Sequence, residues 1–147
     1  MKRYNEAIVL AVCDQIRHSK ATFNIHEIIA EQKEQVEKLD KAIEDKNLAQ
    51  VTHALGSMYC ISVKALWLLG YDEHNILSLI AGSGMFPDFH DFQHGLDVLL
   101  KEPPLRGLLA FANAAFANLV EYTGSEIVAW RTLGTICNDT IIRGNNG

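Results

Sequence analysis

The sequence lacks a long uncharged hydrophobic run. Its longest uncharged stretches, residues 75–87 and 107–120, contain Gly, Pro or Asn and fall short of the roughly 20 apolar residues that a membrane-spanning helix requires. Near the N-terminus, Asp14, Gln15 and Arg17 interrupt the run of apolar residues, so that this segment has no apolar signal-peptide core. These absences predict a cytoplasmic protein with no membrane partner.

A clustered basic surface is also missing. The chain has 13 Lys and Arg residues against 18 Asp and Glu, which gives a net charge of −5 at pH 7. Proteins that bind nucleic acid without sequence preference use a basic face that attracts phosphates. Because the basic residues here are dispersed, we expect no nucleic-acid partner.

Cysteine is scarce and forms no recognisable motif. Cys13, Cys60 and Cys137 are an odd number, lie far apart in the sequence and have apolar neighbours, which is typical of reduced thiols in a protein core. No CxxC pair, phosphate-binding loop, dinucleotide fingerprint or nucleophile elbow is present. The sequence therefore predicts unreactive thiols and offers no enzyme class by motif alone.

Alternation of apolar and polar residues at a period of two is absent, so no sheet is predicted. With 147 residues, 48% of them hydrophobic and 21% charged, the chain fits one globular domain with its own core. The hydrophobic fraction is high for a monomer that must cover its own surface. We therefore expect a homo-oligomer.

Apolar residues recur at helical spacing, which predicts an all-α bundle of about seven helices. The expected helices span residues 2–18, 25–46, 48–70, 73–80, 88–102, 105–123 and 126–142. Asn24, followed by Glu27, is a helix-start signal. Gly70 and Gly124 are placed to end helices in a left-handed conformation, and residues 144–147 are expected to fray.

The segment 48–70 is the best candidate for a central packed helix. Its predicted buried stripe is Leu48, Val51, Leu55, Met58, Ala65, Leu66 and Leu69, with Gln50, His53, Ser57 and Lys64 off the stripe. The helix before it has a thinner stripe of Ile25, Ile28, Ile29, Val36, Leu39 and Ile43. Residues 105–123 are apolar nearly all round, which predicts a second buried helix. The halves 1–86 and 87–147 thus share an order of elements that fits either an internal duplication or an ordinary antiparallel bundle.

Carboxylates recur at three- and four-residue spacing in the helix expected at 25–46. They are Glu27, Glu31, Glu34, Glu37, Glu44 and Asp45, interleaved with Lys33, Lys38, Lys41 and Lys46. Neighbouring carboxylates could share a divalent cation such as Mg²⁺ and present it to phosphates. The same pattern also fits a solvated face on which the lysines neutralise the acids.

Residues 28–76, IIAEQKEQVEKLDKAIEDKNLAQVTHALGSMYCISVKALWLLGYDEHNI, resemble the helical core of the MazG-like all-α nucleoside-triphosphate pyrophosphohydrolases. That superfamily includes dimeric dUTPases and phage dCTPases. The likeness lies in an acidic helix, an apolar helix that ends at Gly, and a short helix after it. The resemblance implies a nucleotide ligand, Mg²⁺ held by carboxylates, and release of pyrophosphate by attack of water.

The positions that hold the metal in that family are altered in this chain. The family's EExxE motif falls on Glu34, Gln35 and Lys38, or leaves the pair Glu31 and Glu34; its ExxD motif falls on Ala54 and Ser57, with a further acidic position at His53. The corresponding places in the second half are Leu108 and Phe111. Because Mg²⁺ needs carboxylate oxygens beside the substrate phosphates, Glu31, Glu34 and His53 make a depleted metal site.

The sequence thus predicts a MazG-like helical protein that binds a nucleotide or a protein partner rather than hydrolysing a nucleotide. The alternative is an active Mg²⁺-dependent nucleoside-triphosphate pyrophosphohydrolase, in which Glu31 and Glu34 act with acids from another chain.

A third hypothesis is independent of the resemblance. His90, His94 and Asp97 follow one another at helical spacing, so two imidazoles and a carboxylate would share a helix face. These groups can bind Zn²⁺ or Fe²⁺. The same residues would also form an ordinary polar stripe beside the apolar face of that helix.

Overall fold

The computed structural model describes residues 2–17, 22–82, 92–101 and 104–146, and in this part of the chain it has seven helices and no strand. The helices are α1 (Lys2–Arg17), α2 (Ile25–Glu44), α3 (Leu48–Leu68), α4 (Glu73–Gly82), α5 (Phe92–Lys101), α6 (Pro104–Thr123) and α7 (Glu126–Asn146). The prediction of an all-α bundle is confirmed.

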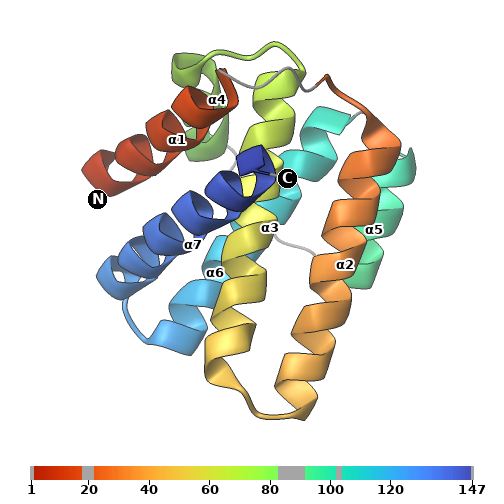
Figure 1. Ribbon diagram of the computed structural model, residues 1–147, viewed down its shortest axis with the longest axis vertical. Coiled ribbons are helices and arrows are strands. Elements are labelled where there is room, and N and C mark those ends of the chain that lie inside the picture. The colour runs from red at the N-terminus through yellow and green to blue at the C-terminus, as the bar shows by residue number, and fades with distance from the viewer. Residues whose placement is uncertain (1, 18–21, 83–91, 102–103, 147) are drawn as a thin grey trace.

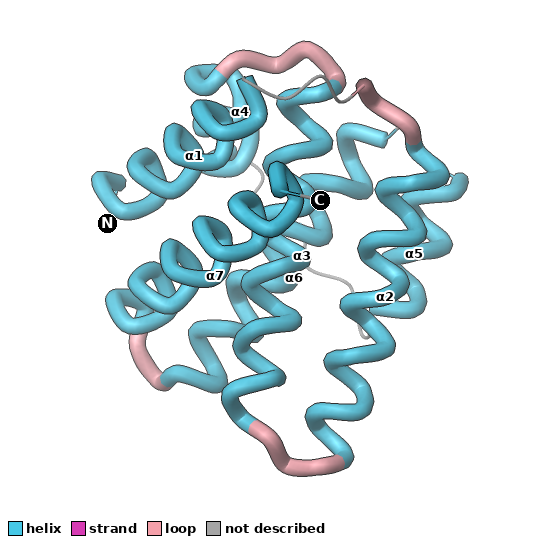
Figure 2. The backbone as a smooth tube through the Cα atoms, in the orientation of Figure 1, coloured by secondary structure: helices cyan, strands magenta, loops and turns pink. Residues whose placement is uncertain are grey.

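Helix α3 runs through the middle of the bundle (Figure 1). Its most extensive contacts are with α6 and α2, and α7 and α1 also pack against it. α5 lies against α2 and α6, while α4 lies against α1 and the end of α3. The turn that joins α2 to α3 and the turn that joins α6 to α7 lie toward the same end of the molecule (Figure 2).

Helix α3 is buried on nearly every side, because α2, α6 and α7 cover it from different directions. Every residue from 54 to 63 is buried. Leu55 and Met58 are in the core as predicted, but Ser57 is buried too, with an exposed fraction of 1%. Leu48 is 55% exposed, because it is the first residue of α3. The prediction of a one-sided buried stripe is therefore wrong at Ser57 and at Leu48.

Helix α2 begins where the sequence predicted. The side chain of Asn24 accepts hydrogen bonds from the backbone N–H groups of His26 and Glu27, at 3.0 and 3.4 Å. The buried residues of α2 are Ile28, Gln32, Val36, Leu39 and Ala42. Ile43, predicted to be buried, is 46% exposed. The buried side of α2 passes through Ala42 instead, because a small residue there permits a close approach to the neighbouring helix.

Both helix-ending glycines have the predicted left-handed conformation, with φ of +108° at Gly70 and +77° at Gly124. Helix α7 continues to Asn146, past the predicted end at residue 142. The prediction of a frayed tail is therefore wrong for residues 144–146, and the packing of α7 against α1 and α3 outweighs the weak helix propensity of Gly and Asn. Residues 88–91 of the helix predicted at 88–102 lie outside the described part.

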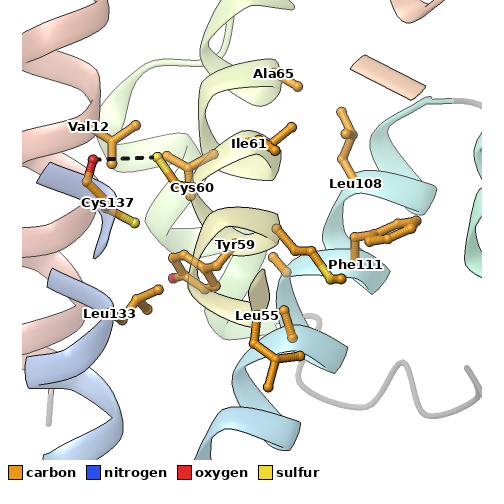
Figure 3. Close-up of a cluster of buried hydrophobic side chains, with 14 of the residues drawn as sticks. Val12, Leu55, Tyr59, Cys60, Ile61, Ala65, Leu108, Phe111, Leu133 and Cys137 are labelled. Atoms are coloured by element: carbon orange, nitrogen blue, oxygen red, sulfur yellow. Dashed lines mark hydrogen bonds between the residues drawn. The ribbon is translucent and has the colours of Figure 1, made fainter. Parts of the chain in front are cut away.

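The buried apolar residues form one cluster to which all seven described helices contribute. Figure 3 shows its centre, where Tyr59 and Leu55 of α3 lie near Leu133 of α7 and Phe111 of α6. Trp130 stacks on Phe116 with ring centroids 3.9 Å apart, and Tyr59 meets the Trp130 ring edge-on at 6.1 Å. Trp130 is thus a core anchor, with an exposed fraction of 6%.

Candidate functional site

A pocket of about 370 Å³ lies between α2 and α3. The described residues that line it are Lys38 and Lys41 of α2 and Gln50, His53 and Ala54 of α3. The two lysines and Gln50 are exposed, His53 is half-buried and Ala54 is buried. The pocket therefore presents two ammonium groups, an imidazole and an amide around an apolar wall. We call it the cationic pocket.

The turn after α2 places the two sides of the cationic pocket opposite each other. The backbone N–H of Lys46 donates to the Ile43 carbonyl at 3.1 Å, and the N–H of Asn47 donates to the Ala42 carbonyl at 2.9 Å. Lys46 has a φ of +56°. The Asn47 side chain then accepts a hydrogen bond from the Gln50 N–H at 3.2 Å, which caps α3. This tight turn reverses the chain so that α3 returns alongside α2.

Two carboxylates of α2 are paired with lysines, and one of these lysines, Lys38, lines the pocket. Glu34 is 3.1 Å from the ammonium group of Lys38, and Glu31 is 3.8 Å from that of Lys64. The side chains of Glu34 and Lys38 are both more than half exposed, at 62% and 57%. Exposed helix pairs of this kind contribute only about 0.3–0.5 kcal/mol, so Lys38 can leave Glu34 for a stronger anionic ligand at little cost.

Unpartnered polar atoms lie one helical turn from the lining residues. Gln35 Oε1 and Ser57 Oγ are buried and have no hydrogen-bond partner. Ser57 follows His53 and Ala54 on α3, and Gln35 precedes Lys38 on α2, so each lies on the same side of its helix as the lining. A buried polar group without a partner costs free energy. Neither Gln35 nor Ser57 belongs to the described lining of the cationic pocket.

The predicted magnesium ligands have different neighbours in the structure. Glu31 and Glu34 each face a lysine, whereas His53 lines the cationic pocket. Among the described residues, no group of three or more His, Cys, Asp or Glu side chains is close enough to hold a metal ion. The role of Glu31, Glu34 and His53 as metal ligands stays a prediction.

The other positions aligned with the family's acids are buried. Ala54 and Ser57 have exposed fractions of 1%, and Leu108 and Phe111 of α6 have exposed fractions of 0%. Leu108 and Phe111 belong to the hydrophobic cluster around α3 (Figure 3). The second half therefore contributes core packing at these places.

The predicted histidine site cannot be assembled from the described residues. His90 lies outside them, and His94 is part of α5 with a side chain that is not described. Asp97 is exposed on α5. Zinc or iron binding by His90, His94 and Asp97 stays a prediction, and loss of tightly bound metal in His94→Ala would test it.

Sequence reasoning missed Lys38, Lys41 and Gln50 as site residues. The lysines had been interpreted as neighbours that neutralise the glutamates of α2. Lys41, however, forms no ion pair with a carboxylate of the described residues and lines the pocket instead. The feature of the sequence that could have revealed these residues is their position on either side of the turn at residues 45–47. A short α-hairpin brings the residues before and after such a turn together.

A second, smaller pocket lies at the same end of the molecule. Its volume is about 220 Å³, and its described lining is Ala42, Ile43, Lys46, Leu48, Val51 and Tyr122. Ile43, Leu48 and Tyr122 are exposed by 46%, 55% and 39%. We call these three residues the apolar patch.

The cysteines behave as the sequence predicted, since all three are free and buried. Burial, reinforced by the nearby negative charge of Glu73, raises the pKa of Cys13 to about 12. The pKa of Cys137 is raised by a hydrogen bond with Cys60 and by burial. The Cys60 thiol also donates to the Cys137 carbonyl at 3.9 Å (Figure 3). Thiols held in the neutral form are poor nucleophiles.

Comparisons with known proteins assign no family to this chain. No protein-family model matches it, and searches of curated proteins and of solved structures find no significant match. Within the described residues, no helix is both long enough and apolar enough to cross a membrane. The function of this chain is therefore inferred from the geometry and charge of the cationic pocket.

Proposed function

We propose that this protein binds a nucleotide through its phosphate in the cationic pocket and does not hydrolyse it. The observation that carries the proposal is the lining of the pocket. Lys38, His53 and Ala54 all line it, and these are positions at which the MazG-like pyrophosphohydrolases would have acids. At Lys38 and His53, groups that can interact with anions thus stand where the resemblance implies metal-holding carboxylates.

The chemistry of the lining favours phosphate as the recognised group. Hydrogen bonds from an ammonium group to a phosphate oxygen are charge-assisted and stronger than neutral ones. Lys38 and Lys41 approach from α2, while Gln50 and His53 can donate from α3. Because the donors come from two helices joined by a capped turn, they can enclose one phosphate group from two sides.

The same lining disfavours hydrolysis. Attack of water on a nucleotide needs a group that activates the water and positive charge that stabilises the phosphoryl oxygens. Glu31 and Glu34 are paired with Lys64 and Lys38, and the described lining holds no carboxylate. Lys38 and Lys41 can neutralise charge, but no described lining residue other than His53 can accept a proton from water.

Titration calorimetry with a panel of nucleotides tests the proposal. Lys41→Gln should weaken binding at least tenfold, because it removes one ammonium group from the pocket. Lys33→Gln removes one charge from the exposed surface of the same helix and should change affinity less than twofold. Equal effects of the two substitutions, or no binding of any nucleotide, would contradict the proposal.

The fate of the bound nucleotide separates binding from catalysis. After prolonged incubation with Mg²⁺, chromatography should recover the nucleotide intact. Release of pyrophosphate that is abolished by Glu34→Gln would instead establish the alternative, a working pyrophosphohydrolase.

A second candidate function, binding of a protein partner, is favoured by the apolar patch. Large apolar side chains that lie together on a surface commonly mark protein interfaces. A second copy of the chain is the first partner to test, by light scattering coupled to size-exclusion chromatography. Leu48→Glu should lower the measured mass if the patch is the oligomer interface, and an unchanged mass would reject that role.

A further inference from the structure

The charge of the cationic pocket decides how a phosphate can be held there. Magnesium is bound by hard oxygen ligands, usually including carboxylates. The described lining offers two ammonium groups, an imidazole, an amide and a methyl group instead, and ammonium groups repel a second cation. A phosphate in this pocket would contact Lys38 and Lys41 directly, with no metal ion between them.

The positive charges of the described lining limit the number of phosphates. A phosphate monoester carries a charge of about −1.5 to −2 near pH 7, which matches the two charges of Lys38 and Lys41. A triphosphate carries more negative charge than these two lysines can balance, and in the presence of Mg²⁺ it arrives with a cation that the pocket repels. One phosphate group therefore fits the charge of the described lining best.

The size of the pocket agrees with a small ligand. Small-molecule sites commonly have volumes of roughly 300–1,000 Å³, and this pocket is near the lower limit at about 370 Å³. This volume exceeds that of an inorganic phosphate ion, so the pocket has room for a nucleoside as well as for its phosphate.

We infer that the ligand of the cationic pocket is a nucleoside monophosphate, bound without a metal ion. This inference rests on the proposed function and narrows it from nucleotides in general to one class. Lys38 and Lys41 hold the phosphate, His53 and Gln50 donate hydrogen bonds to it, and the nucleoside occupies the remaining volume of the pocket beside Ala54.

Calorimetry tests the inference with a nucleoside monophosphate, the matching triphosphate and inorganic phosphate, each with excess Mg²⁺ and with a chelator. The monophosphate should bind with the same affinity, within twofold, in both conditions. In excess Mg²⁺ it should bind at least tenfold more tightly than the triphosphate. It should also bind at least tenfold more tightly than inorganic phosphate.

Two outcomes would overturn the inference but leave nucleotide binding intact: a requirement for Mg²⁺, and tighter binding of the magnesium triphosphate than of the monophosphate. A third outcome, equal affinity for the monophosphate and for inorganic phosphate, would reduce the function to phosphate binding. Absence of binding by every nucleotide in both conditions would overturn the proposed function as well. Lys41→Gln, with Lys33→Gln as its control, places any observed binding in the cationic pocket.

Discussion

Gln32 is a fully buried amide at the contact between α2 and α3. Its Nε2 donates to the carbonyl of Met58 and to the hydroxyl of Ser62, both at 3.1 Å. Its Oε1 is buried and has no partner. The Ser62 hydroxyl itself donates to the Met58 carbonyl at 2.9 Å, so both groups keep a hydrogen bond if Gln32 is replaced.

Gln32→Leu should therefore leave the free energy of unfolding unchanged or raise it by about 1 kcal/mol, because it removes the unpartnered oxygen and retains most of the volume. Gln32→Ala should lower it by about 2–4 kcal/mol, because it leaves a cavity. Urea denaturation measures both values. A loss of more than about 2 kcal/mol in Gln32→Leu would show that the amide contributes more to stability than its hydrogen bonds to Met58 and Ser62 indicate.

The buried thiol of Cys13 and the buried phenol of Tyr59 make the stability of the protein depend on pH in the alkaline range. Burial raises the pKa of Cys13 from its ordinary value of 9.0 to about 12, and it also raises the pKa of Tyr59. When the pH rises above 9, unfolded Cys13 loses its proton while folded Cys13 retains it. The unfolded state is then favoured.

Stability should be constant between pH 7 and pH 8 and should fall as the pH rises from 9 toward 12. The slope for one thiol is at most about 1.4 kcal/mol per pH unit. Urea denaturation at a series of pH values measures this slope, and Cys13→Ala should reduce it. A stability that is flat up to pH 11 in the unsubstituted protein would contradict the burial of these groups.

Some features of single residues can be predicted from the sequence and others cannot. Asn24, Gly70 and Gly124 were predictable because a cap or a positive φ depends on neighbours in the chain. The burial of Gln32 and Ser57 was not, since it depends on which helices cover α2 and α3. The role of Lys41 was missed for the same reason, because its pocket exists only after α3 folds back beside α2.

Helix α3 packs closely against α7 because of a glycine in the middle of the element. A Cβ atom on Gly56 would lie 2.7 Å from Cδ1, 2.8 Å from Cγ2 and 3.0 Å from Cβ of Ile136. These distances are shorter than ordinary carbon–carbon contacts of about 3.5–4.0 Å. Two of the three atoms lie at the branch of Ile136, so a rotation of the end of the side chain cannot relieve the contact.

Gly56→Ala should therefore destabilise the protein by about 1–3 kcal/mol through overpacking, although alanine is the better helix former. Ile136→Ala alone should also destabilise it, by creating a cavity. The double variant should be more stable than the sum of the two effects predicts, because the new methyl group enters the space that Ile136 vacates. Strict additivity in thermal or urea unfolding would contradict the close approach of α3 and α7.

At the scale of the helices, the sequence predicted their number and order and most of their ends. It did not predict how they cover one another. A stripe at helical spacing indicates one buried face, whereas α3 is covered by α2, α6 and α7. Leu48 and Ile43 are apolar and near the turn, and their exposure follows from the end of the hairpin extending past its neighbours.

At the scale of the whole molecule, one end carries both surface features that point to function. The cationic pocket and the apolar patch involve the same hairpin of α2 and α3, with lining residues between 38 and 54. The patch also includes Tyr122 from the last turn of α6. A ligand in the pocket and a protein on the patch would therefore contact a common element, close to the turn at residues 45–47.

The most direct test of nucleotide binding in the cationic pocket is a titration of the ¹⁵N-labelled protein with a nucleoside monophosphate, followed by amide chemical shifts. We expect saturable shifts concentrated at residues 38–41 and 50–57, and their loss in Lys41→Gln. Shifts confined to α1, α4 or α7, or none at millimolar ligand, would contradict the assignment of this pocket as a nucleotide site.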